Sequence, residues 1–328
     1  MIESMAIATI IYYTLFNAAP LIFAAIGGTF TERSGVINIA LEGIMVIGAF
    51  FGAAFAMTSG NPWIGVLAAV IAGAILSWLH AVVSIKFKAN QVVSGTAINL
   101  LAVGVASFMM RAVYGSGGQL LLGTSPSLPR WSLSNLLAPV PILGDFMNTP
   151  FMTRAFGEHA PGVYLAFVAV IVGHIVLFKT PLGLRLRAVG EHPRAADTLG
   201  VNVPRMRYLG VLISGVLAGF AGSILSISPG MSGFVVGMIA GRGFIALAAM
   251  IFGKWTPFGA MGACLLFGLS TSFEVSASVL FRNVPFLQSV PSQFYTMLPY
   301  IITMLALAGF IGRSTPPAAS GIPYETNQ

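Results

Sequence analysis

Nine apolar stretches, each about long enough to cross a membrane as a helix, make up most of this 328-residue sequence. A helix needs about 20 mostly apolar residues to span the hydrocarbon core of a bilayer. Only 8% of the residues are charged, about a third of the share in a soluble domain. A soluble or disordered chain is therefore excluded, and we expect an all-α, polytopic integral membrane protein with about nine transmembrane or broken helices. The stretches are 5–28, 36–57, 63–87, 92–113, 162–178, 208–228, 234–252, 257–281 and 294–312.

Two of these stretches do not fit a simple straight helix. Stretch 36–57 contains Glu42, stretch 234–252 contains Arg242, and both contain several glycines. We expect interrupted helices there, because free backbone groups at membrane depth are tolerated where they line a cavity. Stretch 5–28 lacks the basic start and the small-residue cleavage site of a signal peptide, so we expect it to stay as a helix.

The placement of Lys and Arg predicts the topology, because short cytoplasmic loops carry an excess of these residues. Six of the sixteen basic residues lie in 179–207, which is therefore expected in the cytoplasm. Alternation of the nine stretches then puts the N-terminus outside and the C-terminus inside, with Arg242 in the membrane. The basic residues expected inside are Arg33, Lys86, Lys88, Lys179, Arg185, Arg187, Arg194, Arg205, Arg207, Lys254 and Arg313, and those outside are Arg111, Arg130, Arg154 and Arg282.

Two connections between the stretches are long. The external one, 114–160, is rich in Gly, Ser and Pro, and both a passive connector and a docking surface are consistent with it. The cytoplasmic one is 179–207. We expect one transmembrane domain over 1–313, followed by a flexible cytoplasmic tail, 314–328, that contains two adjacent prolines.

The sequence contains no motif for an energy source or a catalytic centre. A phosphate-binding P-loop needs G-x-x-x-x-G-K-[ST], but Ala248 stands at the first glycine before Gly253 and Lys254, and a tryptophan follows the lysine. Residues 241–246 spell G-x-G-x-x-A without the strand and helix that a dinucleotide site requires. The single cysteine and the scattered histidines form no metal pattern. We expect no enzyme activity, and no cofactor or metal bound by the chain.

Glu42 and Arg242 are the two charges expected deep in the membrane. A charge at that depth costs about 3 kcal/mol on insertion scales, so each must face protein, water or a partner. Two such residues are too few for a catalytic set or a proton relay. For both, a place on a substrate path and a structural role as an ion pair or helix cap remain open. The net charge of +7 does not indicate nucleic acid, because the basic residues form no clustered polar face.

Small residues and an internal echo suggest how the helices pack. Glycines recur at four-residue spacing at 48/52, 215/219 and 233/237/241, which predicts close helix contacts. The segments Asn61-Pro-Trp-Ile-Gly and Thr256-Pro-Phe-Gly each open an apolar stretch after an interrupted one, on opposite sides of the predicted membrane. This weak inverted repeat is typical of transporters.

The cytoplasmic loop carries a motif with a known role in other proteins. Arg194-Ala195-Ala196 followed by Gly200 resembles the E-A-A-x-x-x-G coupling motif of ABC-importer permeases, with Arg194 in place of the glutamate. A short helix with small residues on one face can seat in a cleft of a soluble ATPase. The alternative is an ordinary basic helix on the membrane surface.

Three further blocks carry a family resemblance. They are E-R-S-G-V-I-N-I-A-L-E-G at 32–43, N-Q-V-V-S-G-T-A-I-N-L-L at 90–101 and G-R-G-F-I-A-L-A-A-M-I-F-G at 241–253. Together they resemble the bacterial ABC permeases that serve branched-chain amino acids, ribose and nucleosides. The sequence is most similar to the nucleoside and simple-sugar permeases that work with basic membrane lipoproteins.

The resemblance implies a permease subunit of an ATP-driven ABC importer in the bacterial plasma membrane, with nucleosides as the expected substrate. Its partners would be a cytoplasmic ABC ATPase that uses the ATP, a second and non-identical permease subunit, and an external substrate-binding lipoprotein. A secondary active transporter of a small polar solute, working without an ATPase, is the alternative. The implied coupling residues are Gly190, Glu191, Pro193, Arg194, Ala195, Ala196 and Gly200, and the residues expected on the substrate path are Asn38, Glu42, Gln91, Ser94, Asn99, Arg242 and Phe244.

Overall fold

A computed structural model describes residues 2–115, 118–121, 127–137, 139–140, 143–231, 233–280, 294, 297, 301, 304 and 314–325. In this part of the chain, helices form most of the structure and the strands are short. Within the predicted stretch 294–312, only positions 294, 297, 301 and 304 are described. Arg282 and Arg313 also lie outside the described residues.

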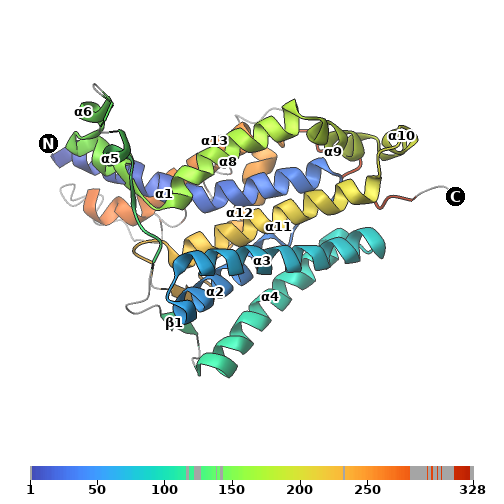
Figure 1. Cartoon of the computed structure of the whole chain (residues 1–328), viewed down its shortest axis with the longest axis horizontal. Helices are drawn as coiled ribbons and strands as arrows, with labels where there is room; N and C mark the ends of the chain where they lie inside the picture. The colour runs from blue at the N-terminus through green and yellow to red at the C-terminus, as the bar shows by residue number, and fades with distance from the viewer. Residues whose placement is uncertain are drawn as a thin grey trace.

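Six described helices are long and apolar enough to cross a membrane. They are α1 (Ile2–Arg33), α2 (Leu41–Ser59), α3 (Pro62–Ala81, continued by the π-helical turn η1, Val82–Lys86), α4 (Gln91–Tyr114), α8 (Pro161–Lys179) and α11 (Val203–Ile227). Two more apolar helices, α12 (Arg242–Phe252) and α13 (Pro257–Leu280), complete the described bundle. The helices run along the long axis of the molecule, and α4 is tilted away from α3 (Figure 1).

The helix starts follow from local sequence. At α3, the Asn61 side chain accepts a hydrogen bond from the Trp63 N–H, and Pro62 takes the first helical position, where no N–H donor is needed. At α11, Asn202 in the same way accepts from the Arg205 N–H. These caps satisfy backbone donors that a helix leaves free at its first turn.

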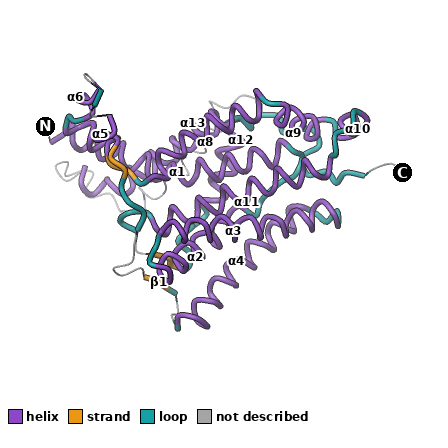
Figure 2. The backbone as a smooth tube through the Cα atoms, viewed as in Figure 1, coloured by secondary structure: helices purple, strands orange, loops and turns teal. Residues whose placement is uncertain are grey.

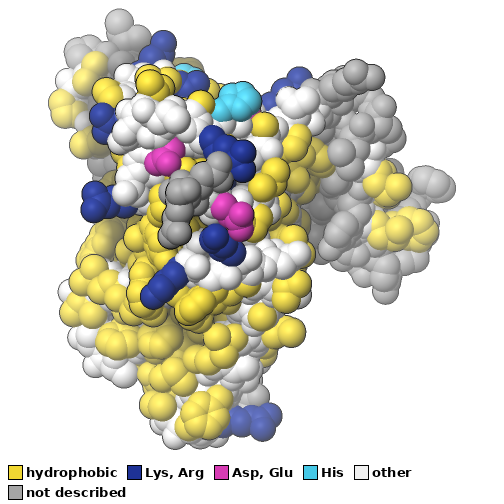
Figure 3. Space-filling model, turned by 90° about the vertical axis from the view of Figure 1, so that its right-hand side faces the viewer, with side chains coloured by type: hydrophobic (Ala, Val, Ile, Leu, Met, Phe, Trp, Pro, Cys, Tyr) yellow, Lys and Arg dark blue, Asp and Glu magenta, His cyan; other side chains and the backbone are white. Residues whose placement is uncertain are grey.

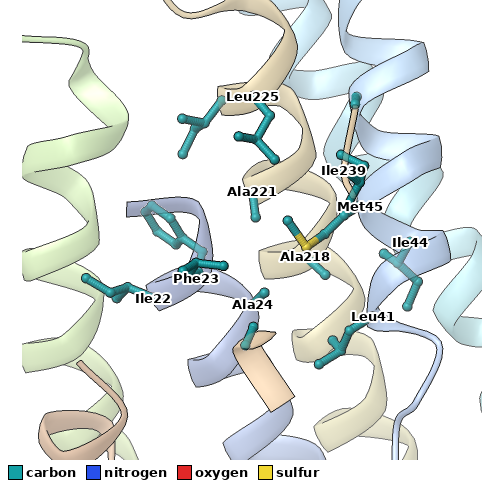
Figure 4. Close-up of a cluster of buried hydrophobic side chains, with 14 of the residues drawn as sticks. Ile22, Phe23, Ala24, Leu41, Ile44, Met45, Ala218, Ala221, Leu225 and Ile239 are labelled. Carbon is teal, nitrogen blue, oxygen red and sulfur yellow. The ribbon is translucent and has the colours of Figure 1, made fainter. Parts of the chain in front are cut away.

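Glycines let α2, α3 and α11 pack backbone to backbone. A side chain at Gly48 would strike Gly219, and one at Gly73 would strike Gly215. The predicted close contacts at 48/52 and 215/219 are therefore confirmed. Around them lies the apolar core, where α11 is sandwiched between α1 and α2 (Figure 4).

Two small groups of elements lie at opposite ends of the bundle. One end holds β1 (Gln119–Leu121), β2 (Trp131–Ser132), α5 (Leu133–Leu137), α6 (Leu143–Met147), α7 (Pro150–Met152), η2 (Thr153–Gly157), β3 (Glu158–His159) and β4 (Gly233–Val235). Here β1 pairs antiparallel with β4, and β2 with β3. We call this the β1 end. Figure 2 shows that the strands are confined to it.

The other end carries α9 (Pro181–Glu191), α10 (Pro193–Thr198) and residues 314–325. We call it the α10 end, and we call residues 314–325 the C-terminal strap. Lys and Arg side chains gather on this end (Figure 3). The two segments of the internal echo begin helices at opposite ends, α3 after Asn61 at the β1 end and α13 after Thr256 at the α10 end (Figure 1).

Two predicted stretches differ from the structure. Stretch 36–57 becomes helical only at Leu41, because backbone groups of residues 37–40 bond to side chains instead of to a helix of their own. The interruption expected in stretch 234–252 is present, and only the second half of the stretch is helix. Its first half forms β4 and a turn, and the glycines at 233, 237 and 241 have positive φ instead of lining a helix face.

Candidate functional site

Residues 34–40, the first interrupted segment, are held by side chains from α3 and α4. The Ile37 N–H donates to Oε1 of Gln91 (2.7 Å), and the Ile37 carbonyl oxygen lies 3.0 Å from Nε2 of His80. Because a carbonyl only accepts, Nε2 carries the proton. The other ring nitrogen, Nδ1, lies 3.0 Å from the Ser94 hydroxyl. Gln91, Ser94 and His80 are all buried.

Two asparagines hold the rest of this segment. The Asn99 amide donates to the Ile39 carbonyl (3.0 Å) and accepts from the Gly43 N–H (2.7 Å), so it bonds both the segment and the first turn of α2. Asn38 accepts from the Ala40 N–H and donates to the Ser214 hydroxyl of α11. Of the seven predicted path residues, Gln91, Asn38 and Asn99 therefore bond to backbone groups of this segment or of the first turn of α2. A fourth, Ser94, contacts His80, which in turn bonds to the segment.

Glu42 connects the first interrupted segment with the second. Its Oε1 accepts from the Gly241 N–H (2.9 Å) and its Oε2 from the Gly243 N–H (2.7 Å). The carboxylate thus caps the start of α12, where free N–H groups and the helix dipole favour a negative charge. A Cβ at Gly243 would lie 2.5 Å from Cα of Glu42, so glycine lets α12 reach α2. Of the roles left open for Glu42, the structure shows the helix cap.

Arg242 and Phe244 lie in the first turn of α12. The Arg242 guanidinium donates from Nη1 to the carbonyl oxygens of Met238 (2.7 Å) and Ile239 (3.2 Å), so it fixes the turn that precedes its own helix. Its charge also acts on the Glu42 carboxylate. Phe244 is 48% exposed. Phe244 is the aromatic residue among the predicted path residues, and its ring is accessible from outside the chain.

At the α10 end, Gly190 and Glu191 join α9 to neighbouring segments. A side chain at Gly190 would strike the Arg33 carbonyl oxygen, so α9 packs directly on the end of α1. The Glu191 carboxylate pairs with the Arg33 guanidinium at 3.7 Å. Arg33 also donates from Nε to the Trp255 carbonyl (3.1 Å), which links α9 to the turn between α12 and α13. Sequence reasoning did not single out Arg33, although it lies in the first family block.

The predicted coupling segment 190–200 is a kinked pair of helices. Pro193 begins α10 after His192, and Gly200 ends it in a left-handed conformation at φ +79°. Ala196 is buried with Val189 and Val203, whereas Arg194 and Ala195 are exposed. A partner that docks on α10 would therefore meet Arg194 and Ala195.

The C-terminal strap covers one side of α9 and α10, where the sequence predicted a flexible tail. The Ala319 N–H donates to the Gly190 carbonyl (2.8 Å), and the Ala318 N–H to the Glu191 carboxylate (3.2 Å). The Tyr324 hydroxyl donates to the Asp197 carboxylate of α10 (2.7 Å). This bond raises the pKa of Tyr324, because it favours the protonated phenol.

Among the described residues, no three His, Cys, Asp or Glu side chains lie together in a way that could hold a metal. At the α10 end, a buried charged side chain forms a hydrogen bond with a backbone carbonyl. Arg207 is almost fully buried and donates to the Ile322 carbonyl of the strap (2.9 Å).

The chain is similar to one protein family and to several known proteins. The family described as branched-chain amino acid transport system / permease component matches residues 10–307. Guanosine ABC transporter permease protein NupQ of Bacillus subtilis (strain 168) is 43% identical over 97% of each chain. Nucleoside ABC transporter permease protein NupC of Lactococcus lactis subsp. cremoris (strain MG1363) is 44% identical over 94% of each chain. Guanosine ABC transporter permease protein NupP of Bacillus subtilis (strain 168) is 24% identical over 92% of this chain and 82% of its own.

Proposed function

We infer the function of this chain from its family, since it belongs to the branched-chain amino acid transport system / permease component family. We propose that it is the membrane-spanning permease subunit of an ATP-driven ABC importer in the bacterial plasma membrane, and that nucleosides are its substrates. The observation that carries the proposal is the identity of 43% and 44% to two permeases named for guanosine and nucleoside transport.

The α10 end faces the cytoplasm and binds the ATPase. This orientation is supported by the basic residues on that end, because cytoplasmic loops of membrane proteins are enriched in Lys and Arg. It places the N-terminus outside and the described C-terminal residues inside. The exposed side chains of Arg194 and Ala195 contact the ATPase, while buried Ala196 holds α10 on α9.

The substrate path runs beside the two interrupted segments that meet at Glu42. Asn38, Gln91 and Asn99 shape it through hydrogen bonds to the backbone, and Ser94 shapes it through His80. Arg242 and Phe244 lie on the short helix α12, and the exposed ring of Phe244 contacts the substrate. Stacking of a nucleobase on an aromatic side chain contributes about 1–3 kcal/mol, which suits this ring to a nucleoside.

Three partners complete the importer. An ABC ATPase supplies the energy, and a second permease subunit forms a heterodimer with this chain. NupQ and NupP, two guanosine permease proteins of one organism, are both similar to this chain, which supports a pair of related but different subunits. A binding lipoprotein delivers the nucleoside at the β1 end. Neither a metal nor another cofactor is required of the permease, which acts as one domain over 1–313.

Uptake of labelled guanosine into vesicles tests this proposal. Vesicles that hold both permeases and the ATPase, with the binding lipoprotein added outside, should accumulate guanosine only with ATP inside. The matched control is an ATPase variant that binds but does not hydrolyse ATP, and it should abolish accumulation. Accumulation by this chain alone, driven by an ion gradient without the ATPase, would overturn the proposal in favour of a secondary transporter.

A further inference from the structure

The C-terminal strap contacts several elements at the α10 end. Besides α9 and α10, it contacts the end of α12, where the Ser314 hydroxyl donates to the Ile251 carbonyl (3.1 Å). The Gly321 N–H donates to the Gly35 carbonyl in the first interrupted segment (3.3 Å). The strap therefore has a fixed place on this end, through bonds made by its own backbone and side chains.

Two further contacts fix the last described residues of the strap. Buried Arg207 of α11 holds the Ile322 carbonyl, and Glu325 pairs with Lys88, ahead of α4, at 3.5 Å. The exposed pair contributes little on its own. The hydrogen bond from the buried Arg207 guanidinium contributes more to the stability of the strap. If the strap moved away, this buried charge would lose the Ile322 carbonyl as its acceptor.

A groove of about 570 Å³ separates the strap from α10. One wall comes from the kink between α9 and α10, and the other from the strap. The lining residues are Glu191, His192, Pro193, Arg194, Ala195, Ala318, Ala319, Ile322, Pro323, Tyr324 and Glu325. The groove therefore contains Arg194 and Ala195, the two residues assigned above to ATPase contact, on one side and strap residues on the other.

Large apolar side chains are exposed at this end, and one of them, Ile322, lines the groove. Leu199, at the end of α10, is 83% exposed, and Ile322 of the strap is 57% exposed. They lie on the end where charged side chains gather, so contact with lipid tails does not explain them (Figure 3). Exposed apolar residues ringed by polar ones are typical of protein docking sites.

We propose that the ABC ATPase docks on a composite surface made of α10 and the C-terminal strap, with Ile322 as an apolar contact. The proposal rests on the function proposed above and adds the strap to it. The ATPase is the occupant because this surface is continuous with the exposed side of α10 that couples to it. In this arrangement the strap holds α10 in place, through the hydrogen bond from Tyr324 to Asp197, and also contacts the ATPase directly.

Protection of engineered thiols tests the proposal without relying on a disruptive substitution. The native cysteine, Cys264, is fully buried and should not react with a water-soluble maleimide. Single variants Ala195→Cys, Ile322→Cys and Leu136→Cys place thiols on α10, on the strap and at the β1 end. The full-length variants, paired with the second permease in lipid nanodiscs, expose both ends to the reagent. The purified ATPase is then added in excess.

The expected result is that the ATPase slows labelling at positions 195 and 322 by about 10-fold or more, while labelling at Leu136→Cys is unchanged. Protection at 195 without protection at 322 would overturn the composite surface and leave the proposed function standing. Protection at neither position would overturn the proposed function as well. Protection at all three would indicate a general block of the reagent and count against specific docking at the strap.

A charge substitution gives an independent measurement. Ile322→Asp places a carboxylate in the proposed apolar contact, and we expect about 10-fold weaker binding of the ATPase to the nanodisc complex. The matched variant Leu136→Asp, at an exposed apolar residue of the β1 end, should bind as tightly as the native chain. Native affinity for Ile322→Asp, with an unchanged melting temperature, would contradict the proposal.

Discussion

Segments 34–40 and 236–241 both interrupt an apolar stretch just ahead of a helix, but their surroundings differ. Every residue of 34–40 is buried or half-buried, and side chains from α3, α4 and α11 bond to the segment. In 236–241, Val236, Gly237 and Ala240 are exposed. That segment is held mainly by Glu42, by Arg242 and by a hydrogen bond from the Val236 N–H to the Gly118 carbonyl, just ahead of β1.

The difference indicates which segment can move during transport. Segments with few buried contacts open at low free-energy cost, whereas segments with many buried hydrogen bonds open only with the whole fold. We infer that 34–40 is a fixed support and that 236–241, with α12, changes position between states. Each of the following substitutions tests that distinction.

The largest effect is expected for Glu42→Ala, because Glu42 bridges the two segments. Loss of the carboxylate removes acceptors from two N–H groups at the start of α12, which should destabilise the chain by about 3 kcal/mol and abolish guanosine uptake. Glu42→Gln keeps an amide oxygen and should restore part of both properties. Thermal unfolding of the detergent-solubilised protein and vesicle uptake measure the two effects. Normal uptake by Glu42→Ala would show that α12 does not need this cap.

Asn99→Ala should remove support from the fixed segment. It leaves the Ile39 carbonyl and the Gly43 N–H without their partner, at a cost of about 2 kcal/mol in stability. Uptake per folded molecule should stay close to native if Asn99 shapes the path only through the backbone groups that it bonds. The control is Thr96→Ala on the same helix, whose hydroxyl bonds only to the Val92 carbonyl. A large loss of uptake per folded molecule would indicate that the Asn99 side chain contacts the substrate itself.

Arg242→Ala, beside the second segment, should change uptake more than stability, the reverse of what is expected for Asn99→Ala. Stability should change by less than about 1 kcal/mol, because the side chain is partly exposed, while the maximal uptake rate falls about 10-fold, or 1.4 kcal/mol. Arg242→Lys keeps the charge and should recover part of the rate. Initial uptake rates at saturating guanosine give the measurement. A variant with normal uptake would make Arg242 a purely structural residue.

Phe244→Leu should raise the KM for guanosine about 5-fold, because a leucine cannot stack on a base as an aromatic ring does. Phe258→Leu is the matched control. Phe258 is exposed to a similar degree, 46% against 48%, but lies in the first turn of α13. Transport kinetics over a range of guanosine concentrations distinguish the two variants. An unchanged KM for Phe244→Leu would remove this ring from the proposed path.

The smallest effect is expected for Ala240→Gly. Ala240 has φ +52°, so glycine relieves strain but gives the unfolded chain more freedom, and the net change should be within about 0.5 kcal/mol. Gly35→Ala in the fixed segment is the counterpart. Gly35 has φ +89°, and a Cβ there would lie 3.0 Å from the Arg207 guanidinium, so we expect a loss of about 1–2 kcal/mol. Equal melting temperatures for the two variants would contradict the comparison.

The sequence predicted the long helices well, because length and hydropathy determine them directly. It also located both interruptions, since a charge and several glycines within an apolar stretch are visible without a structure. It could not show that Asn99 and Gln91 bond to backbone from another helix, because those contacts depend on how α4 packs beside residues 34–40. The family blocks placed these residues together without saying what each one touches.

Two features of the structure that the sequence did not predict have clear physical causes. The glycines at 233, 237 and 241 have the spacing of a helix face, but the same residues also suit a turn with positive φ, and spacing alone does not separate the two. The strap, with its two prolines and few apolar residues, has the composition of a loose tail. It is fixed by backbone N–H groups and by Tyr324, contacts that composition does not reveal.

The strap also has a consequence for the order in which the protein is made. Residues 314–325 follow every described helix in the chain, yet they bond to the ends of α9, α10, α11 and α12. During translation all of these helices are synthesised before the strap exists, so the α10 end is completed only after the last residues of the strap have been made. A polypeptide that terminates early would keep its helices but lack this last piece. ATPase recruitment would then favour permeases whose synthesis has run past residue 325.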